Sequence, residues 1–158
     1  MKATGILFAL LVALTAPAYS QPADSLGLWR IQRGVQAQKG VTSITATLEA
    51  REAQRFLGVR CENQRTYAFI AWNDRVGASP RVGYQIGDEA PLEKVWNTSS
   101  EGTASFVPGR TIEFLNRIAR HDSLRAQATL EDGTPITAVF DLNGIDYALQ
   151  PIREACRW

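Results

Sequence analysis

Apolar and polar residues alternate over short stretches along most of the chain, which predicts a protein built mainly of β-strands. In residues 42–50, Ile44, Ala46 and Leu48 occupy every second position and threonines fill the positions between, as in a strand buried on one face. Residues 66–72 are apolar on both faces, which is typical of a central strand. We predict strands at residues 28–33, 42–50, 56–62, 66–72, 81–87, 93–99, 103–107, 124–130 and 136–142, with a polar lead at 21–27 and a loop at 34–40.

Two segments in the last third of the chain repeat apolar residues at intervals of three and four, which predicts two amphipathic helices. The first spans residues 110–121, and its apolar stripe comprises Ile112, Leu115, Ile118 and Ala119. The stripe of the second comprises Ile145, Ala148, Leu149, Ile152 and Ala155, and Cys156 extends it. Asn143 is the expected N-cap of this last helix, and Pro151 predicts a kink or break because proline lacks the backbone donor.

Many short strands followed by two helices favour an α+β or mainly β fold. Strands joined by short turns favour antiparallel pairing, so we expect a β-sandwich-like domain with the helices covering one face or end. The periodicity leaves the strand order open.

The N-terminal residues have the features of a secretory signal peptide. Lys2 precedes an apolar run at residues 6–14, which is too short to span a bilayer, and small residues follow. We place the cleavage after Ser20, or alternatively after Ala18; a short buried helix is the competing interpretation. Residues 21–158 then form a single exported β-rich domain, which is an ordinary length for one core.

The exported chain has no net charge. Lys2 falls within the predicted signal peptide, so 16 of the 17 basic residues remain beside 16 acidic ones. Nucleic-acid binding depends on basic patches, and a neutral chain without runs of like charge argues against such a partner. No later segment is apolar enough over sufficient length to be a transmembrane helix.

Two cysteines allow one intramolecular disulfide. Cys61 faces inward with Leu57 and Val59 in the strand at 56–62, and Cys156 lies almost at the end of the last helix. An exported protein reaches an oxidising compartment, so we predict a bridge between the two cysteines. Two buried free thiols and a bridge between two copies are the alternatives.

Residues suited to catalysis or metal binding are few. His121 is the only histidine, whereas a hydrolytic triad or a zinc site needs one in a defined constellation; we interpret it as a cation at a helix C-terminus. Glu89 follows Asp88 in a turn. Neighbouring carboxylates in a turn are usually solvated charges, and we interpret these two in that way. Asp141 and Asp146 flank the turn before the last helix, where capping and turn roles compete with ion binding or an acid–base pair. The sequence thus predicts no catalytic residue, no metal site and no cofactor.

Aromatic residues are the better candidates for binding. Trp72, Tyr84 and Trp96 lie on three successive predicted strands, and Arg81 lies nearby. Such residues anchor many protein interfaces, so these four form the candidate partner-binding set. The alternative is that each aromatic residue packs in the core.

Six segments together resemble a known family: residues 57–61, 67–72, 82–84, 96–99, 140–144 and 151–158. The closing Cys156-Arg157-Trp158 belongs to the most specific of them. The chain resembles the VasI or TagO family of type VI secretion accessory proteins, although Tyr84-Gln85-Ile86 stands where a Tyr-Arg pair and an acidic residue are expected. The resemblance implies a periplasmic protein of a Gram-negative bacterium that acts by binding, and it supplies no catalytic residues.

We therefore predict an accessory or adaptor protein that binds an envelope-associated component of a type VI secretion apparatus, without catalysis. The alternative is an inhibitor or binder of a secreted cell-wall hydrolase, a role that small disulfide-closed β domains often fill. An enzyme acting on peptidoglycan would need Glu89, Asp141 or Asp146 in a pocket.

Overall fold

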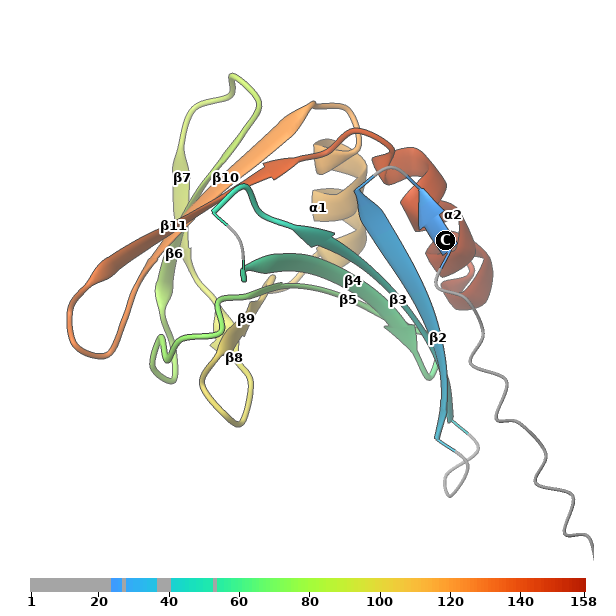
Figure 1. Cartoon of the computed structure of the whole chain (residues 1–158), viewed down its shortest axis with the longest axis horizontal. Coiled ribbons are helices and arrows are strands. Elements are labelled where there is room, and N and C mark those ends of the chain that lie inside the picture. The colour runs from blue at the N-terminus through green and yellow to red at the C-terminus, as the bar shows by residue number, and fades with distance from the viewer. Residues whose placement is uncertain (1–23, 27, 37–40, 53) are drawn as a thin grey trace, which may run out of the picture.

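Two antiparallel sheets and two helices share one hydrophobic core in the computed structural model of the protein (Figure 1). The structure describes residues 24–26, 28–36, 41–52 and 54–158. The predicted signal peptide, residues 1–20, lies outside the described residues. The predicted fold class is confirmed, because antiparallel strands dominate and both helices lie in the last third of the chain.

The larger sheet has the strand order β1-β2-β3-β4-β5-β9-β8, and all its neighbouring strands are antiparallel. The alternation of the sequence decides its buried face, on which Ala46, Leu48 and Val59 are fully buried. Its strands are β1 (Asp24–Leu26), β2 (Trp29–Gln36), β3 (Val41–Glu49), β4 (Phe56–Glu62), β5 (Arg65–Ala71), β8 (Asn97–Thr98) and β9 (Ala104–Phe106).

The smaller sheet has the strand order β11-β10-β6-β7 and is also antiparallel. Its strands are β6 (Arg81–Ile86), β7 (Leu92–Val95), β10 (Ser123–Thr129) and β11 (Pro135–Asp141). Gly133 has a φ of +87° in the turn between β10 and β11, a conformation that suits glycine. Pro135 opens the edge strand β11, where a missing donor is tolerated.

The turn after β3 joins the larger sheet to the edge of the smaller one. The backbone N–H of Arg51 donates to the carbonyl of Val139 at 2.9 Å. In return, the backbone N–H of Val139 donates to Oε2 of Glu52 at 2.8 Å. The outer edge of β11 is thus partly satisfied within the chain, which limits its pairing with another strand.

The two helices pack on different parts of the molecule. Helix α2 (Ile145–Cys156) lies across β2, β3, β4 and β5, and its buried residues are the predicted Ile145, Ala148, Leu149 and Ile152. Helix α1 (Thr111–Ile118) contacts β5 and buries Phe114, Leu115 and Ile118. The predicted stripe of α1 is therefore wrong at Ile112, which is 40% exposed, because Phe114 occupies the inward-facing position instead.

The predicted N-cap of α2 is wrong, and of the kink or break predicted at Pro151 the helix shows no break. Gly144, with a φ of +82°, is the N-cap, and no side chain among the described residues caps this end. Asn143 instead donates its backbone N–H to Oδ1 of Asp141 at 3.2 Å. Pro151 does not break the helix, because Leu149 and Ile152 on either side of it are both buried against the sheet.

Some strand boundaries also differ from the predictions. Residues 24–26, predicted as a polar lead, form β1, and β2 continues to Gln36 in the predicted loop, since Gln36 pairs with Val41 of β3. The predicted strand at 93–99 is two strands in different sheets. Trp96 separates them: it is buried in the core, and turning it inward ends β7.

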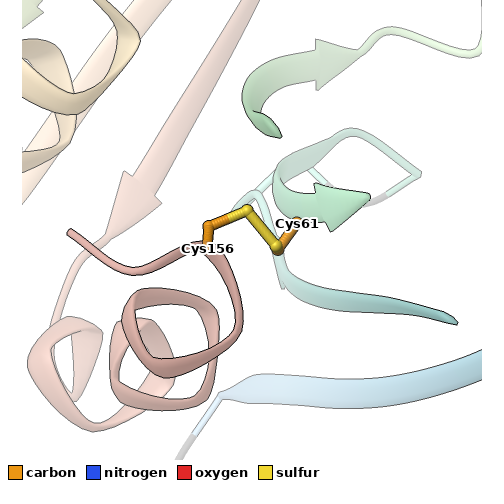
Figure 2. The surroundings of a disulfide bond; sticks show 2 residues. All are labelled: Cys61 and Cys156. Carbon is orange, nitrogen blue, oxygen red and sulfur yellow. A yellow bond between two sulfur atoms is a disulfide. The ribbon is translucent and has the colours of Figure 1, made fainter. Parts of the chain in front are cut away.

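The predicted disulfide between Cys61 and Cys156 is present (Figure 2). It joins the last turn of α2 to β4, across 95 residues of sequence. The chain end then folds back over the helix, and the guanidinium carbon of Arg153 lies 5.3 Å from the ring centre of Trp158. The bridge holds the last turn of α2 against the larger sheet, and the contact with Arg153 holds Trp158 against the helix.

Candidate functional site

The aromatic residues that the sequence singles out lie inside the protein. Trp72 and Trp96 are each 1% exposed, and Tyr84 is 7% exposed. Arg81 is on the surface, where its Nη1 lies 2.9 Å from Oε1 of Glu93 on β7. The candidate partner-binding set therefore forms no single exposed surface. Its three aromatic members, Trp72, Tyr84 and Trp96, pack in the core, as the alternative interpretation predicts.

Two of these residues combine with a third that the sequence interpretation missed. The ring centres of Tyr84 and Trp96 are 5.9 Å apart, and Phe114 of α1 lies 5.9 Å from Tyr84 and 6.2 Å from Trp96. All three pairs are edge-to-face, an arrangement that stabilises aromatic contacts. This aromatic cluster fixes the inner face of α1, so its polar face is directed outward.

Trp72 belongs to a different contact. Its indole N–H donates to Oγ of Ser105 on β9 at 3.0 Å, and both side chains are fully buried. The bond joins the end of β5 to β9 inside the larger sheet. Trp72 is thus a structural residue of the core.

Glu89 joins the turn between β6 and β7 to the end of α1. Its carboxylate is hydrogen-bonded to Arg117, and its Oε1 lies 3.0 Å from Nε2 of His121. The turn itself is held by Gln85, whose Nε2 donates to the carbonyl of Glu89 at 3.1 Å. The interpretation of Glu89 as an ordinary solvated charge is therefore wrong: it is 30% exposed and has two cationic or polar partners.

The hydrogen bond from Arg117 lowers the pKa of the Glu89 carboxyl below its ordinary value of 4.5, and His121 acts in the same direction. The same bond raises the pKa of Arg117. Glu89 is therefore ionised at neutral pH and suits a structural ion pair better than a general acid. We call Glu89, Arg117 and His121 the Glu89 cluster.

A groove of about 850 Å³ lies beside α1 and the start of β5. Residues three or four apart share a helix face, so Glu113, Arg117 and Arg120 all border it from α1 and the residues just after it. We call it the arginine groove; the lining residues used below are Arg65, Thr66, Arg110, Ile112, Glu113, Asn116, Arg117 and Arg120.

Two of the four arginines in this groove are neutralised within the protein. Nε of Arg110 lies 2.7 Å from Oε2 of Glu113, and Arg117 pairs with Glu89. Arg65 and Arg120 have no ion-pair partner in the described parts of the chain. The hydroxyl of Thr66 is buried and has no hydrogen-bond partner there. The groove therefore presents positive charge that the described fold does not neutralise, whereas the buried hydroxyl of Thr66 is not accessible to a ligand.

A smaller cavity of about 450 Å³ borders the same part of α1. It shares Arg110, Glu113 and Arg117 with the arginine groove and adds Lys94 and Trp96. The indole N–H of Trp96 is buried and has no acceptor among the described residues. The basic character of this surface thus extends past α1 towards β7.

Asp141 and Asp146 have local roles. Oδ1 of Asp141 accepts the backbone N–H of Asn143 at 3.2 Å, and Oδ1 of Asp146 lies 3.4 Å from Nη1 of Arg153. Within the described ranges, no three His, Cys, Asp or Glu side chains are grouped so that they could hold a metal ion. Over the same residues, no helix has the length and apolarity needed to cross a membrane.

The comparison with family models identifies the chain. A model described as "Type VI secretion system VasI, EvfG, VC_A0118" matches residues 13–158. The chain belongs to the VasI family. This confirms the resemblance found in the sequence and makes the protein a type VI secretion-associated one. A search of curated proteins gives no match for the chain.

The fold of this VasI-family protein is similar to that of a solved protein, "invasion associated protein b from bartonella henselae". The TM-score is 0.57, and the alignment covers 87% of this chain and 100% of that chain. The sequences are 14% identical, so the likeness describes the fold alone.

Proposed function

We propose that this VasI-family protein is a periplasmic accessory protein of a type VI secretion apparatus, and that it acts by binding a protein component of that apparatus. The family match over residues 13–158 carries the proposal. The Cys61–Cys156 disulfide supports the compartment, because such bridges form and persist outside the reducing cytosol. The predicted signal peptide at residues 1–20 points the same way.

Binding is a better account of the described surface than catalysis. The carboxylates that an enzyme would need are engaged in an ion pair or in turn and helix contacts, as Glu89, Asp141 and Asp146 are. The exposed arginines beside α1, in contrast, suit recognition of another molecule. An adaptor needs such a surface and a stable fold, and both are present.

The test is affinity capture of the tagged, full-length gene product from its own host, after brief crosslinking of intact cells and release of the periplasm. We expect mass spectrometry to find envelope components of the type VI apparatus enriched. Cys156→Ser serves as a control for a weakened fold. Fractionation of the same cells should place the protein in the periplasm.

Either of two results would contradict the proposal. Recovery of one soluble cell-wall hydrolase in place of secretion components would favour the inhibitor alternative. Recovery of the protein in the cytosol would remove the proposed compartment.

A further inference from the structure

We propose that the arginine groove is the docking surface for an acidic polypeptide segment of the partner, with Asp or Glu carboxylates of that segment pairing with Arg65 and Arg120. The inference rests on the proposed function in taking the partner to be a protein. It goes further by naming the surface and the chemistry that the surface recognises.

The distribution of charge carries the first step. Glu113 and Glu89 each pair with one arginine of the groove, whereas Arg65 and Arg120 lack a carboxylate partner in the described chain. Both arginines line the same concavity, Arg65 from the start of β5 and Arg120 from the turn after α1. An anionic ligand lying in the groove would therefore meet two unneutralised cations, and guanidinium groups bind carboxylates through paired hydrogen bonds.

The remaining lining favours a peptide over other anions. Asn116 offers an amide that donates and accepts, as peptide backbones require. Ile112 is 40% exposed at the groove and gives an apolar contact for a side chain of the segment. An anionic membrane is instead typically bound by a cluster of about four to eight Lys or Arg residues. Within the described ranges, only two arginines of this site lack a carboxylate partner.

The groove is also held in shape before any partner arrives. The aromatic cluster of Tyr84, Trp96 and Phe114 anchors the inner face of α1, and Glu89 fixes its C-terminal end through Arg117. β5 is paired with β4 over its whole length, Arg65 and Thr66 included, and with β9 at Phe69–Ala71. Rigid walls reduce the entropy lost on binding, which favours recognition by a small number of charged contacts.

The test uses the exported protein and a fluorescein-labelled peptide in which glutamates alternate with glycines around a central leucine. Fluorescence anisotropy measures its affinity, and the same peptide with glutamines is the control ligand. The groove variant is Arg65→Glu/Arg120→Glu, which breaks no ion pair between residues that the structure describes. Its matched control is Arg125→Glu/Arg157→Glu, in which two other exposed arginines without ion-pair partners in the described chain carry the same charge change outside the groove.

We expect the glutamate peptide to bind the wild-type protein and the groove variant to lose about tenfold or more in affinity, equal to about 1.4 kcal/mol. The matched control should keep its affinity within about twofold, because its two arginines lie outside the groove. Both variants change the net charge equally, so long-range electrostatics alone would weaken them alike. Equal losses in the two variants would overturn the inference, as would absence of saturable binding to the wild type. Binding of phosphatidylglycerol vesicles, with no binding of the peptide, would assign the groove to a membrane and overturn it too.

The capture experiment with the same variants separates the two proposals. If the groove variant still recovers the secretion components that the wild type recovers, the docking surface is wrong and the proposed function stands. If the wild type recovers none, the proposed function fails whatever the peptide shows.

Discussion

Gly87, in the turn after β6, lies against His121. Its φ is +50°, and a Cβ built on it would lie 2.5 Å from Nδ1 of His121. We expect Gly87→Ala to lower the free energy of unfolding by about 2–4 kcal/mol, because a left-handed alanine is strained and also overlaps the imidazole. Urea denaturation measures the loss.

Gly133→Ala is the matched control for this change. Gly133 has a φ of +87°, and a Cβ there would have no heavy atom within 4 Å. It should cost only the backbone strain, about 1–2 kcal/mol. If the two variants lose equal stability, the close approach of His121 is not the reason why residue 87 is glycine.

Glu89 should make stability depend on pH below neutrality. Its pKa is lower in the folded protein than the ordinary value of 4.5, chiefly through the hydrogen bond from Arg117, so the folded state binds fewer protons than the unfolded state near that pH. The stabilisation is therefore complete above pH 4.5 and is lost as the pH falls through the lower, folded pKa. We expect Glu89→Gln to flatten this acid limb in urea titrations at a series of pH values.

Arg117→Gln provides the complementary test, because it removes the main cause of the lowered pKa. Glu89→Gln should then change the acid limb little in the Arg117→Gln background. An acid limb unchanged by Glu89→Gln in the otherwise wild-type protein would contradict the assignment.

At the scale of residues, the sequence showed which groups are present but not which of them meet. Glu89 and His121 stand in separate segments, and nothing in the local pattern of either indicates the 3.0 Å contact between them. The same holds for Phe114, whose aromatic partners come from β6 and from the connection between β7 and β8. The disulfide was predictable because the chain has only two cysteines.

At the scale of elements, periodicity located the strands and helices whose bounds depend on the local sequence alone. The bounds of β4, Phe56–Glu62, agree with the prediction, since a regular alternation between turn residues defines a strand. The division at Trp96 was not predictable, because residues 93–99 read as one strand until the burial of Trp96 assigns its two halves to different sheets. The arginine groove was missed for a similar reason: Arg65 and Arg120 border the same groove only because α1 packs beside β5.

A buried side-chain hydrogen bond between Trp72 and Ser105 should strengthen the pairing of β9 with β5. Ser105→Ala leaves the indole N–H of Trp72 buried without its acceptor, so we expect a loss of about 1–3 kcal/mol in the free energy of unfolding. A double-mutant cycle isolates the bond, because Ser105→Ala should cost much less in a Trp72→Phe background. Equal costs in both backgrounds would show that the bond contributes little and that the loss comes from packing.

At the scale of the whole molecule, one covalent link connects parts of the chain that the sheets alone leave independent. The larger sheet begins with consecutive strands, whereas α2 is the last element and reaches it only after the smaller sheet is complete. Burial of Ile145, Leu149 and Ile152 places α2 across β2 to β5, and the Cys61–Cys156 bridge fixes it there. Strand order could not be read from the sequence, because it depends on such long-range contacts rather than on local periodicity.

Removing this bridge should weaken the fold without abolishing it. In the chain-entropy model, a link across 95 residues stabilises the protein by about 4–5 kcal/mol, because it restricts the unfolded chain. We expect the free energy of unfolding of the Cys61→Ala/Cys156→Ala protein, measured by urea denaturation, to be lower by that amount, while its far-UV circular dichroism is kept, since the buried face of α2 still packs on the sheet. Reductant should destabilise the wild type similarly and leave the variant unaffected. A variant as stable as the oxidised wild type would show that α2 is held by packing alone.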